Sequence, residues 1–156
     1  MMQRRSFLKS LGAVAAISAV VSPSAVFAKE APKGENAMNL ETAIKAITGG
    51  KKVVESSKVS LKAPEIAENG AVVPVSVSVD SPMSEADYVK AIHIFATKNT
   101  NVRCADVMLS PMNGGASFST RVKLGSSQDV MALVETSKGE FLSAKQNVKV
   151  TIGGCG

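Results

Sequence analysis

The sequence predicts an all-β domain: an immunoglobulin-like sandwich of two antiparallel sheets, preceded by a short N-terminal helix. Three observations lead to this prediction. Apolar and polar residues alternate over residues 71–80, seven strand-like segments are separated by turn residues at intervals of roughly 8 to 15 residues, and only residues 39–48 have a helical period. Many short strands without intervening helices are typical of a two-sheet sandwich rather than of a parallel α/β sheet.

The chain begins with a predicted signal peptide of the twin-arginine type over residues 1–28. The paired residues Arg4 and Arg5 stand one residue before Phe-Leu-Lys, an apolar run follows over residues 11–21, and small residues mark a cleavage point after Ala28. The apolar run is too short for a membrane span, which needs about 20 residues. Because the twin-arginine route exports folded proteins, we expect a folded periplasmic protein with no membrane segment after cleavage.

A linker over residues 29–38 and one helix follow the signal peptide. Asn39 is a candidate N-cap, apolar residues then recur three and four positions apart, and Gly49 and Gly50 are a stop signal. This pattern predicts a short amphipathic helix over residues 39–48.

The strands of the predicted sandwich lie within a domain predicted over residues 39–152. In residues 71–80 the valines lie on one face, and Pro74 on the other face cannot donate to a ladder, which predicts an edge strand or a bulge there. Turns rich in Gly, Pro, Asn and Ser separate the remaining strand candidates. These candidates are residues 58–62, 88–97, 105–109, 117–124, 130–136 and 141–152.

The charge of the chain argues against nucleic acid as a partner. The chain has 18 basic and 13 acidic residues, a net charge of +5, but three of the basic residues lie in the signal peptide, which leaves 15 against 13. The mature domain has no stripe of Lys and Arg and few aromatic residues. It therefore lacks the surface that binding to a phosphate backbone needs.

The sequence predicts no metal site, no cofactor and no enzyme active site. His93 is the single histidine, and Cys104 and Cys155 are 51 positions apart, so no familiar ligand spacing occurs. Neither a Gly-x-Ser-x-Gly elbow nor a Cys-x-x-Cys pair is present. His93 alternates with isoleucines in a predicted strand, which favours a structural or surface role. A thiol-dependent enzyme that pairs His93 with Cys155 is a minor alternative.

The last four residues contain the pattern that points to a function. They are Gly153, Gly154, Cys155 and Gly156, so a thiol has glycines on both sides. Glycine leaves the backbone free and the sulfur sterically open, and four residues extend by roughly 13 Å. We predict a flexible arm that carries Cys155 into the cleft of another protein. The alternatives are a structural cysteine, a disulfide to Cys104 and a bridge between chains.

This ending and several other stretches resemble the SoxY family, the sulfur-carrier subunits of the periplasmic thiosulfate-oxidising Sox system, whose members typically end in Gly-Gly-Cys-Gly-Gly. The resemblance spans nearly the whole mature domain. Two features depart from the family pattern, because the final glycine is missing and Cys104 has no place in the motif. The stretches that carry the resemblance are residues 64–70, 73–75, 81–83, 88–95, 119–122 and 148–156.

The resemblance implies a covalent sulfur carrier that has no turnover of its own. It implies that a haem c-type oxidase (SoxXA) joins thiosulfate to Cys155, that a hydrolase (SoxB) releases the terminal sulfonate as sulfate, and that in some systems a sulfane dehydrogenase oxidises the remaining sulfur. It also implies an immunoglobulin-like sandwich and a heterodimer with a SoxZ subunit. The alternative function is a non-catalytic protein-binding sandwich domain with a structural or disulfide-forming cysteine.

Overall fold

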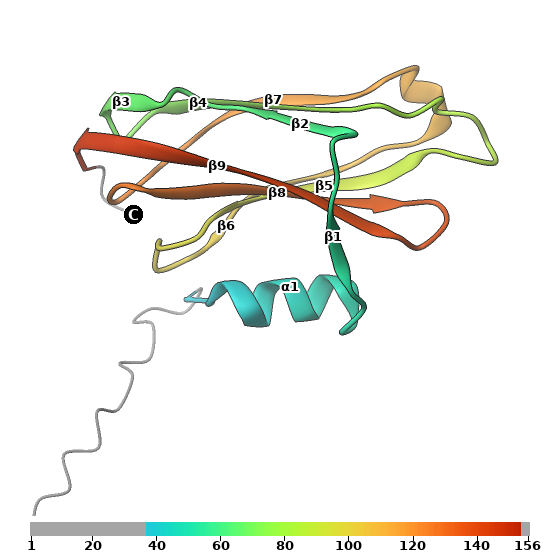
Figure 1. Ribbon diagram of the computed structural model, residues 1–156, viewed down its shortest axis with the longest axis horizontal. Coiled ribbons are helices and arrows are strands. Elements are labelled where there is room, and N and C mark those ends of the chain that lie inside the picture. The colour runs from blue at the N-terminus through green and yellow to red at the C-terminus, as the bar shows by residue number, and fades with distance from the viewer. Residues whose placement is uncertain (1–36, 154–156) are drawn as a thin grey trace, which may run out of the picture. The chain divides into compact units, whose positions relative to one another are not determined.

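The computed structural model describes residues 37–153, which fold into two β-sheets and one α-helix (Figure 1). The predicted signal peptide and most of the linker lie outside these residues. Within the described part of the chain, no helix is long and apolar enough to span a membrane.

The helix, α1, spans Leu40–Thr48 and has the ends that the sequence predicts. The Asn39 side chain accepts a hydrogen bond of 2.8 Å from the amide of Thr42, which caps the first turn. Gly49 ends the helix in the left-handed conformation at φ 62°, and its amide donates to the carbonyl of Lys45. The predicted boundaries of this helix are confirmed.

The larger sheet has six strands in the order β1-β9-β8-β5-β6, with β3 also paired to β9. The pairs β5–β6, β5–β8 and β8–β9 are antiparallel, whereas β1 and β3 each run parallel to β9. Strand β9 is the longest and pairs with three other strands. The strands are β1 (Val53–Glu55), β3 (Ile66–Asn69), β5 (Val89–Ala96), β6 (Arg103–Met108), β8 (Gln128–Thr136) and β9 (Phe141–Ile152).

The smaller sheet has three antiparallel strands in the order β2-β4-β7. These are β2 (Val59–Lys62), β4 (Val73–Val79) and β7 (Ala116–Val122), and a 3₁₀ turn at Pro111–Asn113 leads into β7. The valines of β4 are buried against the larger sheet, while its alternate residues face outward. This is the half-buried alternation that the sequence predicts.

Two hydrophobic cores lie on opposite faces of the larger sheet. Ile92 and Ile94 of β5 point into the main core between the sheets. Phe95, the next residue, points to the other face, where it packs with Met131 and with Ala43 of α1. Figure 1 shows α1 on the side of the larger sheet that faces away from β2, β4 and β7. The helix therefore covers a face that a two-sheet sandwich would otherwise expose.

The all-β sandwich and all seven predicted strands are confirmed, with two additions and one refinement. The short parallel strands β1 and β3 were not predicted. Strand β4 is the central strand of its sheet, but its last partner in β2 is the Ser76–Lys62 pair, so at Pro74 it has only β7 beside it. The proline thus lies where one side of the strand is open, which removes the need for a ladder hydrogen bond there.

Candidate functional site

The candidate site is the end of β9, which leads to the predicted arm. Cys155, Gly154 and Gly156 lie outside the described residues, so the structure describes this site up to Gly153. The last residue of β9 that pairs with β8 is Val148, opposite Gln128. The strand then continues for four more residues, beyond the end of β8.

Strand β3 holds one side of this extension. The amide of Lys149 donates to the carbonyl of Glu65 at 2.8 Å, and the amide of Gly70 donates to the carbonyl of Ile152 at 2.8 Å. The hydroxyl of Thr151 donates to the carbonyl of Glu68 at 2.9 Å. The strand is therefore anchored by β3 up to its last residue.

A serine just before the first residue of β8 holds the other side, where β9 extends beyond β8. The Ser127 hydroxyl accepts a hydrogen bond of 2.9 Å from the amide of Val150 and donates one of 3.4 Å to the Val150 carbonyl. This side chain replaces the backbone partner that a neighbouring strand would supply. The end of β9 is thus bonded on both sides.

Gly153 follows directly and approaches another glycine closely. A Cβ atom at position 153 would stand 2.5 Å from the carbonyl oxygen of Gly125, closer than real side chains approach a backbone oxygen. Gly125 lies in the turn between β7 and β8, and the amide of Leu124 in that turn donates to the Gly70 carbonyl at 2.7 Å. We call Gly70, Gly125, Ser127 and Gly153 together the exit site.

The sequence predicts turns between the strands, and Gly125 and Ser127 lie in one of them, but no sequence pattern connects that turn to the arm. The connection depends on pairing between segments far apart in the chain, and no local pattern encodes that pairing. From the sequence, flexibility is the only role expected for Gly153.

Cys104, the other cysteine, is a free and half-buried thiol in β6. Burial raises the pKa of the Cys104 thiol, although a hydrogen bond with the Ala96 backbone opposes this effect. Strands β8 and β5 lie between β9 and β6. Three strand spacings of about 4.8 Å therefore place Cys104 roughly 14 Å to the side of β9.

His93 has a structural position, in agreement with the favoured interpretation of the sequence. It is 3% exposed, and its Nδ1 lies 2.5 Å from a carboxylate oxygen of Asp106, whose other oxygen accepts a hydrogen bond of 2.8 Å from Arg103. Through β8, His93 is level with Ser143, ten residues before Gly153 on β9. The imidazole is therefore distant from the exit site.

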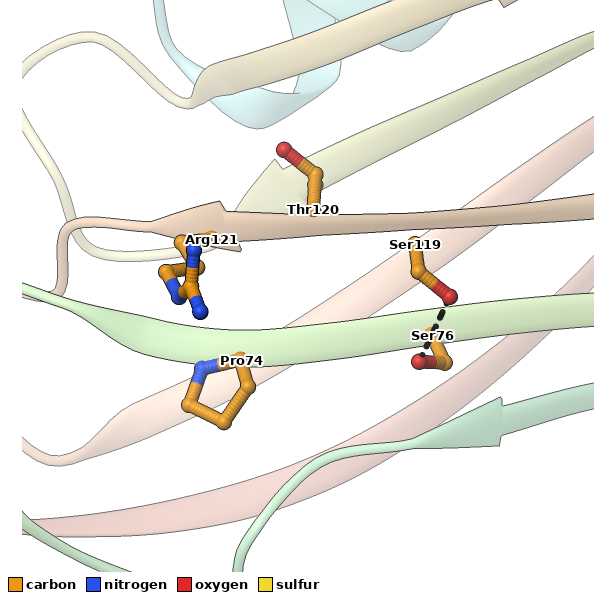
Figure 2. Close-up of a pocket in the computed structure, with 5 residues that line it drawn as sticks. All are labelled: Pro74, Ser76, Ser119, Thr120 and Arg121. Carbon is orange, nitrogen blue, oxygen red and sulfur yellow. Dashed lines mark hydrogen bonds between the residues drawn. The ribbon is translucent and has the colours of Figure 1, made fainter.

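A shallow hollow on the outer face of β4 and β7 lacks the side chains of an active site. Figure 2 shows its five lining residues: Pro74, Ser76, Ser119, Thr120 and Arg121. The hydroxyl of Ser119 donates to that of Ser76 at 2.9 Å, and none of the five lining residues is a His, Asp or Glu that could act as a general base. Among residues 37–153, no group of three or more His, Cys, Asp or Glu side chains is arranged to hold a metal ion.

Comparisons with known structures find similar proteins that include a sulfur carrier and a superoxide reductase. The SoxY sulfur carrier protein from Chlorobium limicola f thiosulfatophilum is 33% identical, with a TM-score of 0.62, over 73% of this chain and 97% of that one. A superoxide reductase (neelaredoxin) from Ignicoccus hospitalis is 21% identical, with a TM-score of 0.53, over 75% of this chain and 97% of that one. At that identity the second likeness shows a shared fold and no shared chemistry.

The search of curated proteins found no match. The family model for the sulfur oxidation protein SoxY matches residues 44–155, from α1 through β9 and on to Cys155. Together with the Chlorobium likeness, this match over most of the chain establishes that the chain belongs to the SoxY family.

Proposed function

We propose that this chain is a covalent carrier that holds thiosulfate-derived sulfur on Cys155 and has no turnover of its own. Membership of the SoxY family supports the carrier role. The observation that carries the proposal is the course of β9, which extends past β8 and ends at an exposed Gly153, two residues before Cys155. The domain would thus present the thiol at one end of the sandwich.

The proposed loading step is an oxidation that forms one S–S bond. The Cys155 thiolate and the outer sulfur of thiosulfate join to give cysteine S-thiosulfonate, and the two electrons released pass to the haem irons of a SoxXA-type oxidase. In the next step a SoxB-type hydrolase adds water across the terminal S–S bond. Sulfate and two protons leave, and a persulfide remains on Cys155 for a sulfane dehydrogenase where one is present.

Geometry limits where these enzymes act. Two residues beyond Gly153 extend by no more than about 7 Å, so the Cα of Cys155 stays within that distance of the Gly153 Cα. An enzyme that reaches the sulfur must therefore approach the end of β9. Through β5 and β8, Cys104 is level with about Lys145 on β9, eight residues before Gly153, so at about 3.3 Å per residue it lies roughly 26 Å back along the strand as well as roughly 14 Å to its side. A disulfide needs Cα atoms within about 7 Å, and a reach of about 7 Å beyond Gly153 cannot close that gap. We therefore assign Cys104 no part in the carrier chemistry.

The family implies a Sox system in which a SoxZ subunit is the partner of this chain. Strands β6 and β7 each pair with a single neighbour among the described residues. Open edges of this kind are suited to pairing with a second protein chain. We propose a SoxZ heterodimer in the periplasm, exported in folded form by the twin-arginine route.

The test is to load the mature chain, in complex with its SoxZ subunit, with thiosulfate and the cognate haem oxidase. Intact mass should increase by one thiosulfate, and reductant should remove it. Cys104→Ser is the matched control and should load like the wild type, whereas Cys155→Ser should not load. An adduct that persists in Cys155→Ser, or a wild-type chain that gains no mass, would refute the proposal.

A further inference from the structure

We infer that Gly153 is a positioning residue, which sets the point and direction in which the cysteine-bearing tail leaves the domain. This inference rests on the proposed function, because it concerns how Cys155 reaches the enzymes that act on it. It differs from the role of flexible hinge that a glycine next to a carrier cysteine suggests.

The first argument is steric. The Cβ of any other residue at position 153 would stand 2.5 Å from the Gly125 oxygen and 3.4 Å from the Gly125 carbonyl carbon. Both atoms belong to the backbone, so no side-chain rotation relieves the contact. Either the turn that contains Gly125 or the chain at Gly153 has to move.

The second argument is that the turn is held in place. The amide of Gly125 donates to the side-chain oxygen of Asn99 at 3.1 Å, and that same oxygen accepts a 2.8 Å hydrogen bond from Gln128. The Asn99 side chain in turn donates to the carbonyl of Lys123 at 2.8 Å. Gln128 is only 1% exposed, so moving the turn would disturb hydrogen bonds that connect it to a buried polar side chain.

The third argument is that β9 is also held, up to the residue before Gly153. Gly70 bonds to Ile152, and Ser127 bonds to Val150 on the opposite side. With both the turn and the strand anchored, a side chain at position 153 would deflect the chain that follows. A displacement of about 1 Å at a reacting group lowers the rate by on the order of 100-fold, so a change of exit direction affects the loading step strongly.

The variant that tests this inference is Gly153→Ala, with Gly154→Ala as its matched control one residue further on. Both are made in the full mature chain, in complex with the SoxZ subunit and in a Cys104→Ser background. The probe is thiosulfate with the cognate haem oxidase, and initial loading rates are read by intact mass. We expect Gly153→Ala to load at least about tenfold more slowly than Gly154→Ala.

A small thiol reagent separates exit direction from thiol chemistry. Reaction of Cys155 with the Ellman reagent should be equally fast in the wild type and in Gly153→Ala, because a small molecule needs no defined approach. The amide NMR signals of Gly125 and Ser127 should shift in Gly153→Ala and remain in place in Gly154→Ala.

One measurement needs no variant. The backbone order parameter of Gly153 in the wild type should be close to the rigid value of about 0.85, and a value below about 0.6 would overturn the inference. Equal slowing of loading in both variants would also overturn it while leaving the carrier function intact. A wild-type chain that does not load at all refutes the carrier function and this inference with it.

Discussion

Within residues 37–153, the buried side chain of His93 has a hydrogen-bond partner at only one of its two ring nitrogens. His93 lies on the helix-covered face of β5, and Asp106 is its register partner on β6. Its Nε2 atom is buried and has no hydrogen-bond partner among the described residues. A polar side chain with one unmatched nitrogen depends strongly on the bond that the other nitrogen makes.

We therefore expect Asp106→Ala to destabilise the fold by about 1–3 kcal/mol, because it leaves a second buried nitrogen of His93 without a partner. Urea unfolding at pH 7 measures the change. The matched control is Asp80→Ala, which removes an exposed carboxylate and should change the free energy of unfolding by less than about 0.5 kcal/mol. Equal effects of the two substitutions would contradict this account of His93.

Cys104 is expected to be a slow thiol in the folded protein. Burial raises its pKa, so the thiolate fraction at neutral pH is below that of an exposed cysteine and increases only at higher pH. In a Cys155→Ser variant at pH 7, alkylation by iodoacetamide should be on the order of tenfold slower in the folded than in the urea-unfolded chain.

The reaction is followed by intact mass, and its rate in the folded chain should increase as the pH is raised. Similar rates in the folded and unfolded chains would show that burial does not protect Cys104.

For single residues, the sequence predicted the role of a side chain better than it predicted the contacts of that side chain. The structural role of His93 followed from its alternation with isoleucines. Its partner Asp106 did not, because residues opposite each other on two strands are set by register rather than by any local motif. The contact between Gly153 and Gly125 escaped prediction for the same reason.

Among the elements, the end of β9 extends beyond β8, and on that side the Ser127 side chain makes the hydrogen bonds to its backbone. We expect Ser127→Ala to release the amide of Val150, so that its hydrogen exchange becomes faster than in the wild type. The free energy of unfolding should fall by only about 0.5–1.5 kcal/mol, since one exposed hydroxyl is lost.

Ser126→Ala provides the control, because the Ser126 hydroxyl makes no hydrogen bond with the described residues. Exchange at Val150 should be unchanged in that variant. Unchanged exchange in Ser127→Ala as well would mean that β3 alone holds this part of the strand.

Elements with a strong local signal were predicted, and elements without one were not. Helix α1 carries its own cap and stop, strand β4 alternates clearly, and β5 and β8 are long apolar segments. Strands β1 and β3 contain only three and four residues, and each pairs in parallel with β9, more than 80 positions further along the chain. Nothing in so short a segment indicates a partner at that distance.

For the whole molecule, we expect the fold and the carrier function to be separable at Gly153. Removing residues 154–156 deletes no part of either described sheet, so the melting temperature should change by less than about 3 °C while thiosulfate loading is lost. Circular dichroism and intact mass measure the two properties.

The reference variant ends at residue 140 and lacks β9. It should show no cooperative unfolding, because β1, β3 and β8 all lose a neighbour. A full loss of melting in the shorter deletion would contradict the boundary at Gly153.

The architecture was predicted from patterns that every sandwich shares, whereas the site was predicted mainly from a family resemblance. Alternation and turn spacing are sufficient for two sheets, because burial of one face determines them. The helix-covered face and the exit site both depend on contacts between distant segments, and composition gives no indication of either.

The position of β9 in the chain also has a consequence for biosynthesis. Among the described strands, the one that joins β1, β3 and β8 is the last to be translated, and two of its partners are among the first. The larger sheet cannot close while residues 141–152 are still inside the ribosome. The larger sheet therefore completes only after β9 has left the ribosome, which leaves the earlier strands open to chaperones until then.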